Sequence, residues 1–252
     1  FFDKHLQVEL NSRIVHMQNF FANRGALGAA YFDPTQAVYD TAGVNGYYEW
    51  MDGSDPVNLA PKNPLGLLNS REDISKVNRL IGNVKLSYKL HFFPMVKVVV
   101  NAGTDQSEGT GSVTVPVNSA SGFYSLGSYS QYRQTKGNKL LEAYANFNNG
   151  EKKSKHLVDV TLGYSYQDWY TSSPNNATYS LGNPDSVIQV AEANPFYTKN
   201  ALLSFYGRLI YTFNNKYVFN AVLRRDGSSR FSPDTRWGLF PSVSAAWIVS
   251  NE

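Results

Sequence analysis

The C-terminal part of the chain alternates between apolar and polar side chains, and this pattern constrains the fold more than any other feature. Apolar residues stand at every second position of 203–213, with one glycine as the exception, and the positions between them are mostly polar. The turn 214–216 leads into a second alternating run over 217–224, and a third covers 237–249 after a loop at 226–235. A period of two predicts strands with one apolar and one polar face, and the short Asn-rich turn predicts a β-hairpin.

An apolar strand face needs a partner that removes it from water. In a soluble β-sandwich this partner is a second sheet, and in an outer-membrane barrel it is lipid. The alternation by itself leaves both possibilities open.

Two motifs in this C-terminal part carry a family resemblance. They are Leu223-Arg-Arg-Asp-Gly-Ser-Ser-Arg-Phe231 and Arg236-Trp-Gly-Leu-Phe-Pro-Ser-Val-Ser-Ala-Ala-Trp247. At this spacing they closely resemble the signature of SusC/RagA-like TonB-dependent outer-membrane transporters. Segments 23–30, 33–36 and 63–68 are also similar to the corresponding family segments, so the resemblance covers essentially the whole chain.

The resemblance implies a fold, a function and a set of partners. Family members form an antiparallel transmembrane β-barrel of about 22 strands around a plug domain, with long extracellular loops. The implied function is active import of large nutrients, oligosaccharides or peptides, across the outer membrane of a Gram-negative cell. A SusD-like surface lipoprotein is the implied partner, and the TonB complex is the implied source of energy.

The composition agrees with a barrel. Aromatic residues make up 14% of the chain and charged residues only 17%, below the roughly 25% of a typical soluble protein. The net charge of +3 is too small to indicate a nucleic-acid partner. The absence of cysteine excludes disulfides and thiolate metal sites, and no apolar run of about 18 residues predicts a membrane helix.

The first residues, Phe1-Phe2-Asp3-Lys4, lack the basic and apolar regions of a signal peptide. An exported barrel needs such a peptide, so we expect the chain to be a fragment of a longer protein, or else not an outer-membrane protein. Under the resemblance, residues 1–252 are part of the barrel domain. The plug domain, the signal peptide and the remaining barrel strands are then absent from them.

Long segments rich in turn residues alternate with short turns along the chain. We expect long loops at 18–73, 104–122, 170–200 and 226–235, and short turns at 91–95, 148–155 and 214–216. This alternation requires 123–147 to be one long strand, since two spanning strands there would break it. The prediction is an all-β, antiparallel barrel segment of about eight spanning strands, the first over about residues 4–17.

Aromatic residues in the expected loops are candidates for contact with a substrate or partner, because aromatic faces stack on sugar rings and anchor protein interfaces. They form two groups in the sequence, Tyr47, Tyr48 and Trp50 in the first loop and Trp169, Tyr170, Tyr179, Phe196 and Tyr197 near the third. The alternative is that these rings pack the loops against each other or form an interfacial girdle.

Charged residues on the polar positions of the strands are candidates for the barrel lumen. These lumen-facing candidates are Arg79, Lys85, Lys89, Glu142, Asp159 and Arg208. They would contact the plug or line the path of the substrate, or simply solvate the barrel interior. Arg224, Arg225, Asp226 and Arg230 allow an anion site, but we favour a charged strand end in which Asp226 pairs with neighbouring arginines.

Signatures of catalysis and of cofactor binding are absent from the sequence. It contains no GxSxG, HExxH, P-loop or GxGxxG motif, and its four histidines lie in unrelated segments without the spacing of metal ligands. We therefore expect no enzyme activity, no metal and no cofactor. Three other classes remain as alternatives to the importer: a soluble β-sandwich binding module, a passive porin or adhesin-type barrel, and a glycan hydrolase.

Overall fold

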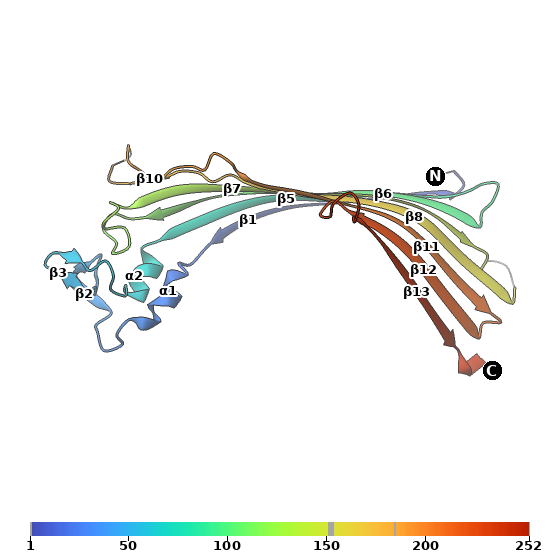
Figure 1. Ribbon diagram of the computed structural model, residues 1–252, viewed down its shortest axis with the longest axis horizontal. Helices are drawn as coiled ribbons and strands as arrows, with labels where there is room; N and C mark the ends of the chain where they lie inside the picture. The colour runs from blue at the N-terminus through green and yellow to red at the C-terminus, as the bar shows by residue number, and fades with distance from the viewer. Residues whose placement is uncertain (1, 151–153, 184, 252) are drawn as a thin grey trace.

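The computed structural model describes residues 2–150, 154–183 and 185–251. They form one long, curved antiparallel sheet, with a small folded unit beyond one end of its first strands (Figure 1). The eight long strands are β1 (Leu6–Phe20), β5 (Glu72–Lys89), β6 (Val96–Val115), β7 (Ser128–Asn148), β8 (His156–Ser173), β11 (Phe196–Phe213), β12 (Tyr217–Ser228) and β13 (Trp237–Trp247).

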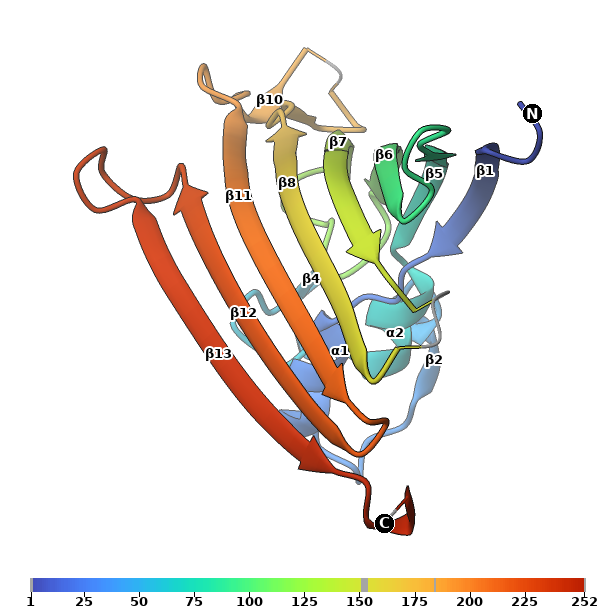
Figure 2. The same ribbon diagram turned by 90° about the vertical axis from the view of Figure 1, so that its right-hand side faces the viewer.

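Each long strand pairs with the long strand that follows it in the chain. The order across the sheet is β1-β5-β6-β7-β8-β11-β12-β13, and every pairing is antiparallel. This confirms the predicted all-β segment of about eight strands. In the described part of the chain, β1 pairs only with β5 and β13 only with β12, so the curved sheet is open along both edges (Figure 2).

The turn between β11 and β12 is the predicted hairpin. Asn214 and Asn215 have φ angles of 54° and 55°. Positive φ at both central positions is the requirement of a type I′ turn, and asparagine tolerates it better than most residues do.

The prediction of a loop at 104–122 is wrong over most of this range. Strand β6 continues to Val115, in register with β7 up to the pair Val115↔Ser128. This stretch is rich in glycine and polar on both faces, so its side chains carry no alternation although its backbone is fully paired. The actual connection, which we call the second loop, covers residues 116–127 and ends in a turn at Leu126 and Gly127, which both have positive φ.

Other strand boundaries also differ from the prediction. Strand β1 begins later and ends later than expected, at Leu6–Phe20, and β7 begins at Ser128 rather than at residue 123. The expected loop at 170–200 is shorter, because β8 reaches Ser173 and β11 begins at Phe196. The third loop, residues 174–195, holds β9 (Thr178–Tyr179), which pairs with β7, and β10 (Val187–Gln189).

The segment expected as the first long loop is folded. We call residues 21–71 the first-loop unit, which lies beyond the ends of β1 and β5 (Figure 1). It contains α1 (Gly25–Gly28), η1 (Ala29–Tyr31), β2 (Tyr39–Val44), β3 (Met51–Asp52), β4 (Asp55–Pro56) and α2 (Pro64–Asn69). These elements are too short to leave a periodic pattern, so the sequence predicts only a loop there.

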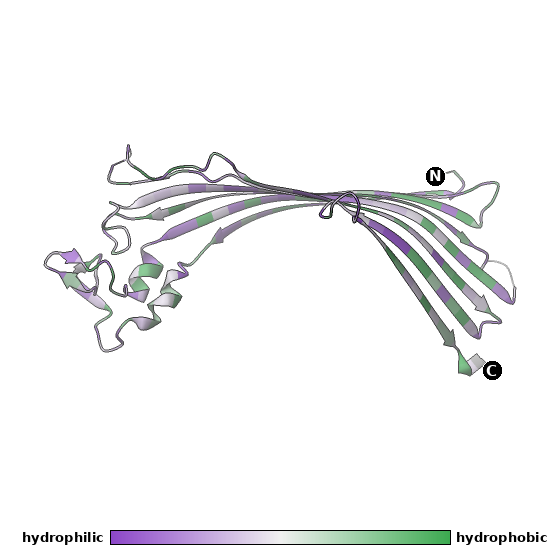
Figure 3. Ribbon diagram, in the orientation of Figure 1, coloured by the Kyte–Doolittle hydropathy of each residue, from purple (hydrophilic) through white to green (hydrophobic). Residues whose placement is uncertain are grey.

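The two faces of the sheet differ in chemistry. We call the apolar face the one that carries Phe205, Leu209, Phe219, Leu223 and Val243, and the polar face the one that carries Lys85, Glu142, Asp159, Arg208 and Arg224. Hydrophobic and hydrophilic residues alternate along β11 to β13 (Figure 3). In β12 the side chains at apolar-face positions up to residue 225 are exposed, whereas the intervening ones are half-buried.

The sheet is a single layer without a packed core. Among the described residues of the eight long strands, Val99 is the only buried large apolar side chain, and the buried Ala29 and Pro56 belong to the first-loop unit. No helix in this described part is long and apolar enough to cross a membrane. The apolar face of the sheet therefore has no partner within the described residues.

Candidate functional site

The six charged residues predicted to face a lumen lie on one side of the sheet. Lys85, Asn101 and Glu142 are register partners across β5, β6 and β7. The other predicted charges lie on the same face, because each stands an even number of positions along its strand from a residue in this series of register partners. This is the polar face, opposite Phe205 and Leu209. The strand pairing thus brings together residues that are as much as 129 positions apart in the sequence, from Arg79 to Arg208.

Most of these charges have polar partners on neighbouring strands. Lys85 Nζ lies 3.5 Å from Glu9 Oε1, Arg79 Nε donates to Asp105 Oδ1 at 2.8 Å, and Asn101 Nδ2 donates to Glu142 Oε2 at 3.3 Å. On the strands that follow, Asn146 and Asn148 donate to Asp159 at 2.9 and 2.7 Å, and Arg208 Nε donates to Asn220 Oδ1 at 3.4 Å. Pairs this exposed contribute little to stability, so their main consequence is a hydrophilic surface.

The two adjacent arginines of the first motif point to opposite faces. Arg224 Nε donates to both carboxylate oxygens of Asp226, at 2.7 and 3.0 Å, and its Nη2 donates to Ser204 Oγ at 3.0 Å. The predicted pairing of Asp226 with a neighbouring arginine is confirmed. Arg225 lies on the apolar face, with its guanidinium carbon 4.9 Å from the ring centre of Trp237. A single anion site made of both arginines is therefore excluded by the strand geometry.

Each aromatic residue predicted in the first loop packs against another ring of the first-loop unit. Tyr48 and Trp50 meet edge to face with ring centres 5.5 Å apart, and Tyr47 lies 5.7 Å from Tyr39. The hydroxyl of Tyr47 accepts a hydrogen bond from Asn69 Nδ2 at 2.8 Å. Tyr48 and Trp50 thus form one aromatic pair and Tyr47 forms another with Tyr39, so each ring keeps only part of its surface for a ligand.

The other predicted aromatics are spread over several strands. Trp169 and Tyr170 belong to β8 rather than to a loop and point to opposite faces; Tyr170 donates its hydroxyl to Gln106 Oε1 at 2.7 Å. Phe196 and Tyr197 open β11, also on opposite faces, and Tyr179 lies in β9. The last three are the more exposed, at 57%, 59% and 43%. The eight predicted aromatics form separate groups in the described structure.

A cluster that the sequence did not indicate lies at the loop end of the polar face. Tyr132 donates its hydroxyl to Asp73 Oδ1 at 2.9 Å, and Asp73 Oδ2 lies 3.1 Å from Arg71 Nη2. Arg71 Nε is buried without a hydrogen-bond partner. These residues border a hollow of about 590 Å³ that also includes Phe21 and Arg24 of the first-loop unit. A cation, a carboxylate and a phenol here could contact a polar ligand.

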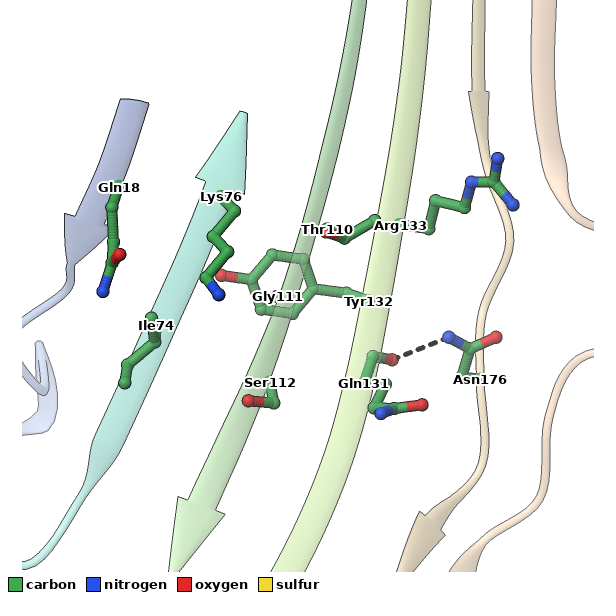
Figure 4. A pocket seen from close by; sticks show the side chains of 10 residues that line it. All are labelled: Gln18, Ile74, Lys76, Thr110, Gly111, Ser112, Gln131, Tyr132, Arg133 and Asn176. Atoms are coloured by element: carbon green, nitrogen blue, oxygen red, sulfur yellow. Dashed lines mark hydrogen bonds between the residues drawn. The ribbon is translucent and has the colours of Figure 1, made fainter. Parts of the chain in front are cut away.

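The ring of Tyr132 reaches this cluster by crossing its register partner, Gly111. A Cβ atom at Gly111 would stand 2.3 Å from Tyr132 Cζ, so only glycine leaves room for the ring. Figure 4 shows the ring lying across β6 at this position, beside a second hollow of about 560 Å³ that includes Lys76 and Asn176. The pairing depends on strand register, which is why the sequence alone did not reveal it.

The first-loop unit is held together by a buried polar centre. Asn63 is fully buried, and its side chain donates to Val38 O and Tyr48 O at 2.8 and 3.3 Å. Its Oδ1 caps α2 by accepting from the backbone N–H groups of residues 65 and 66. Its own N–H donates to Glu49 Oε1 at 3.1 Å. Burial raises the pKa of the Glu49 carboxyl, while the hydrogen bond from Asn63 and the charge of Lys62 act against this shift.

The second loop joins the other two long loops. Asn118 Nδ2 donates to Asn45 Oδ1 at 3.0 Å, and the Tyr124 hydroxyl donates to Pro56 O at 2.8 Å, both in the first-loop unit. On its other side, Ser180 Oγ donates to Ser125 O at 2.8 Å. The three loops therefore form one connected surface at the same end of the sheet.

No group of three or more His, Cys, Asp or Glu side chains in the described ranges has the arrangement of a metal site. The site consists instead of the polar face, the cluster around Asp73 and the connected loops. Such a surface offers hydrogen bonds and charge to a passing or docking ligand.

Comparison with known proteins identifies relatives of this chain. The chain is 31% identical to the TonB-dependent receptor SusC of Bacteroides thetaiotaomicron over 281 aligned residues, which cover 100% of this chain and 27% of SusC. The chain is a homologue of SusC. It is also 35% identical to the TonB-dependent receptor P39 of Formosa agariphila over 116 residues, covering 42% of this chain and 11% of that receptor. No protein-family model matches the chain.

Solved structures support the same fold for this SusC homologue. The RagAB peptide transporter superposes with a TM-score of 0.73 at 18% sequence identity, over 99% of this chain and 29% of the transporter chain. The RagAB peptide importer in its open-open state gives the same TM-score over 98% of this chain. The predicted resemblance to SusC/RagA-like receptors is confirmed. The chain spans about a quarter of the length of SusC.

The two motifs that carry the resemblance lie at the last two strands of the sheet. The first motif covers the end of β12 and the beginning of the loop after it, and the second covers β13. SusC and P39 are both named as receptors and not as enzymes.

Proposed function

We propose that this chain is part of the barrel of an outer-membrane, TonB-dependent importer of large nutrients, either oligosaccharides or peptides. The observation that carries the proposal is the 31% identity to SusC over the whole chain. The ordered, eight-stranded sheet and its superposition on RagAB support it.

The dimensions of the apolar face fit a bilayer. Trp237 and Trp247 stand ten positions apart at the two ends of β13, both on the apolar face. At about 3.3 Å per residue and a tilt near 40°, this distance spans a height of about 25 Å, the height of the lipid-facing band of outer-membrane barrels. Between them Leu239 and Val243 are 61% and 83% exposed, which suits contact with acyl chains.

The open edges of the sheet support a larger barrel. Unpaired backbone groups are not tolerated in hydrocarbon, so β1 and β13 need further strands as neighbours. We propose that the whole receptor supplies these strands, together with a signal peptide, a plug domain and the segment that contacts the TonB complex. In this arrangement the chain crosses the membrane several times.

The polar face would then line the lumen. Arg79, Lys85, Lys89, Glu142, Asp159 and Arg208 are proposed to contact the plug or the passing substrate. The exposed rings of Tyr179, Phe196 and Tyr197 are proposed as ligand or partner contacts at the loop end. Tyr47, Tyr48, Trp50, Trp169 and Tyr170 remain proposed contacts, although the packing described above leaves them less surface.

The connected loops suggest how a partner docks. We propose that a SusD-like surface lipoprotein covers the loop end and that the ligand is captured between it and the loops. Displacement of the plug, driven through TonB, would then open the path along the polar face. No cofactor, nucleic acid or catalytic step is part of this proposal.

The test uses the bacterium that carries the gene. The gene for the whole receptor is deleted, and uptake of labelled oligosaccharides and peptides is measured with and without a functional TonB. We expect the receptor in the outer-membrane fraction, and we expect deletion of either gene to abolish uptake of one ligand class. A receptor found in the soluble fraction, or uptake unchanged by its deletion, would contradict the proposal.

A passive barrel is the second candidate, because an open lumen lined by polar residues also conducts solutes without energy. The same experiment separates the two functions. A passive barrel predicts uptake that depends on the receptor gene and is unchanged when TonB is removed.

A further inference from the structure

Arg225 is an isolated charge on the apolar face of the last three strands. Its register partners are Phe205 on β11 and Leu239 on β13, and Leu223 precedes it on the same face of β12. The other apolar-face positions of β11 to β13 carry no acidic residue, and Lys199 is their only other charge. Arg225 is exposed, and no carboxylate in the described part of the chain pairs with it.

The one described contact of the Arg225 guanidinium is with Trp237. The guanidinium carbon lies 4.9 Å from the centre of the ring. The ring itself lies over Gly227, where a Cβ atom would stand 2.9 Å from it, and it stacks beside Phe205 with ring centres 6.3 Å apart. Arg225 and Trp237 are therefore held next to each other by two strands and a glycine that makes room for the ring.

The height of this pair is that of a membrane interface. This step rests on the proposed function, in which Trp237 and Trp247 mark the two edges of the lipid-facing band. Arg225 pairs with Leu239, two positions inside the band, and reaches up to Trp237 at its loop-side edge. Tryptophan prefers this level, and a long basic side chain that starts below it extends its charge toward the headgroups.

An arginine at this level that has no carboxylate partner is a suitable site for an anion from the membrane. Its planar guanidinium forms paired hydrogen bonds with phosphate oxygens, and these are stronger at a partly dehydrated interface. The neighbouring Phe205, Leu239 and Leu223 offer an apolar surface to the acyl chains below. We propose that Arg225 and Trp237 bind the phosphate of an anionic lipid headgroup in the leaflet on the loop side.

The test measures lipids retained by the whole receptor in detergent, using native mass spectrometry. Phosphatidylglycerol is the anionic probe, and phosphatidylcholine with the same acyl chains is the zwitterionic comparison. We expect the wild type to prefer phosphatidylglycerol, and we expect Arg225→Gln to lower its apparent affinity about tenfold. Arg225→Lys should lose part of this affinity, because it keeps the charge without the paired geometry. Arg208→Gln, which removes an arginine from the polar face, is the matched control and should retain wild-type binding.

Two results would overturn the inference. One is an unchanged preference for phosphatidylglycerol in Arg225→Gln, and the other is complete displacement of the lipid by millimolar inorganic phosphate, which would indicate a site for free phosphate. Membrane fractionation and nutrient uptake are measured on the wild type in parallel. A receptor that resides in the membrane and imports, but shows no lipid binding that depends on Arg225, contradicts this inference and leaves the proposed function intact.

Discussion

At the scale of single residues, Asn63 shows how one side chain can organise a loop. The pair Asn63-Pro64 is typical of a turn in the sequence. In the structure it begins α2, with asparagine as the N-cap and proline in the first turn. Turn and helix start need the same residues, so the local sequence could not separate them. The burial of Asn63 depends on Val38 and Tyr48, far away in the chain, and no local pattern indicates it.

We expect Asn63→Ala to destabilise the first-loop unit by about 2–3 kcal/mol, because it removes a helix cap and the two side-chain hydrogen bonds to the carbonyls of Val38 and Tyr48. Hydrogen exchange over residues 21–71 of the whole receptor measures this change. Asn58→Ala is the control, since Asn58 is exposed and should leave exchange unchanged. Equal exchange in the two variants would show that Asn63 does not hold the unit.

At the scale of elements, glycines paired with aromatic rings recur across the sheet. Four register pairs share this arrangement, Gly111–Tyr132, Gly137–Tyr170, Gly163–Tyr206 and Gly227–Trp237. At each glycine, a Cβ atom would come within 3.0 Å of the partner ring. A ring that covers a glycine of the neighbouring strand restores packing that the glycine lacks and helps to fix the register.

We expect Gly163→Ala to destabilise the sheet by about 1–3 kcal/mol, because the new methyl group overlaps the Tyr206 ring. Adding Tyr206→Ala should remove the overlap, so the double variant should lose less than the sum of the single ones. Gly82→Ala is the matched control, since its nearest atom would be 3.6 Å away. Thermal unfolding in detergent measures all four variants, and strictly additive losses would contradict the pairing.

The strands differ in how well the sequence predicts them. Residues 201–224 alternate over two strands and an Asn-rich turn, and the structure matches this prediction closely. The second half of β6 is not predicted because it is polar on both faces. Apolar and polar residues alternate only where the two faces of a strand have different surroundings. The sequence predicts that the six charges share the polar face, because the alternation within each strand shows which face a residue is on. The Tyr132–Asp73 contact requires knowledge of the register between strands, which the sequence does not contain.

At the scale of the whole molecule, the second loop links the first-loop unit to the third loop. Its donors Asn118 and Tyr124 contact the unit, and Ser125 accepts from Ser180 of the third loop. We expect Asn118→Ala combined with Tyr124→Phe to speed proteolytic cleavage within residues 21–71 about thirtyfold, since two hydrogen bonds of about 1 kcal/mol each are lost.

Ser180→Ala serves as the reciprocal variant for the loop linkage. It should increase cleavage within 174–195 and leave 21–71 as in the wild type. Limited proteolysis of the whole receptor, with fragments identified by mass, distinguishes the two patterns. Identical cleavage in all three proteins would mean that the loops hold their places independently.

The single-layer sheet has a thermodynamic consequence. In water, a domain with a packed core exposes apolar surface when it unfolds, which gives a large heat-capacity change and a steep dependence on denaturant. Here the described long strands bury one large apolar side chain, that of Val99, and the apolar face is already exposed before unfolding. The heat capacity of unfolding and the denaturant slope should therefore be small for a chain of this length. Most of the burial that stabilises this sheet then comes from the lipid and the neighbouring strands.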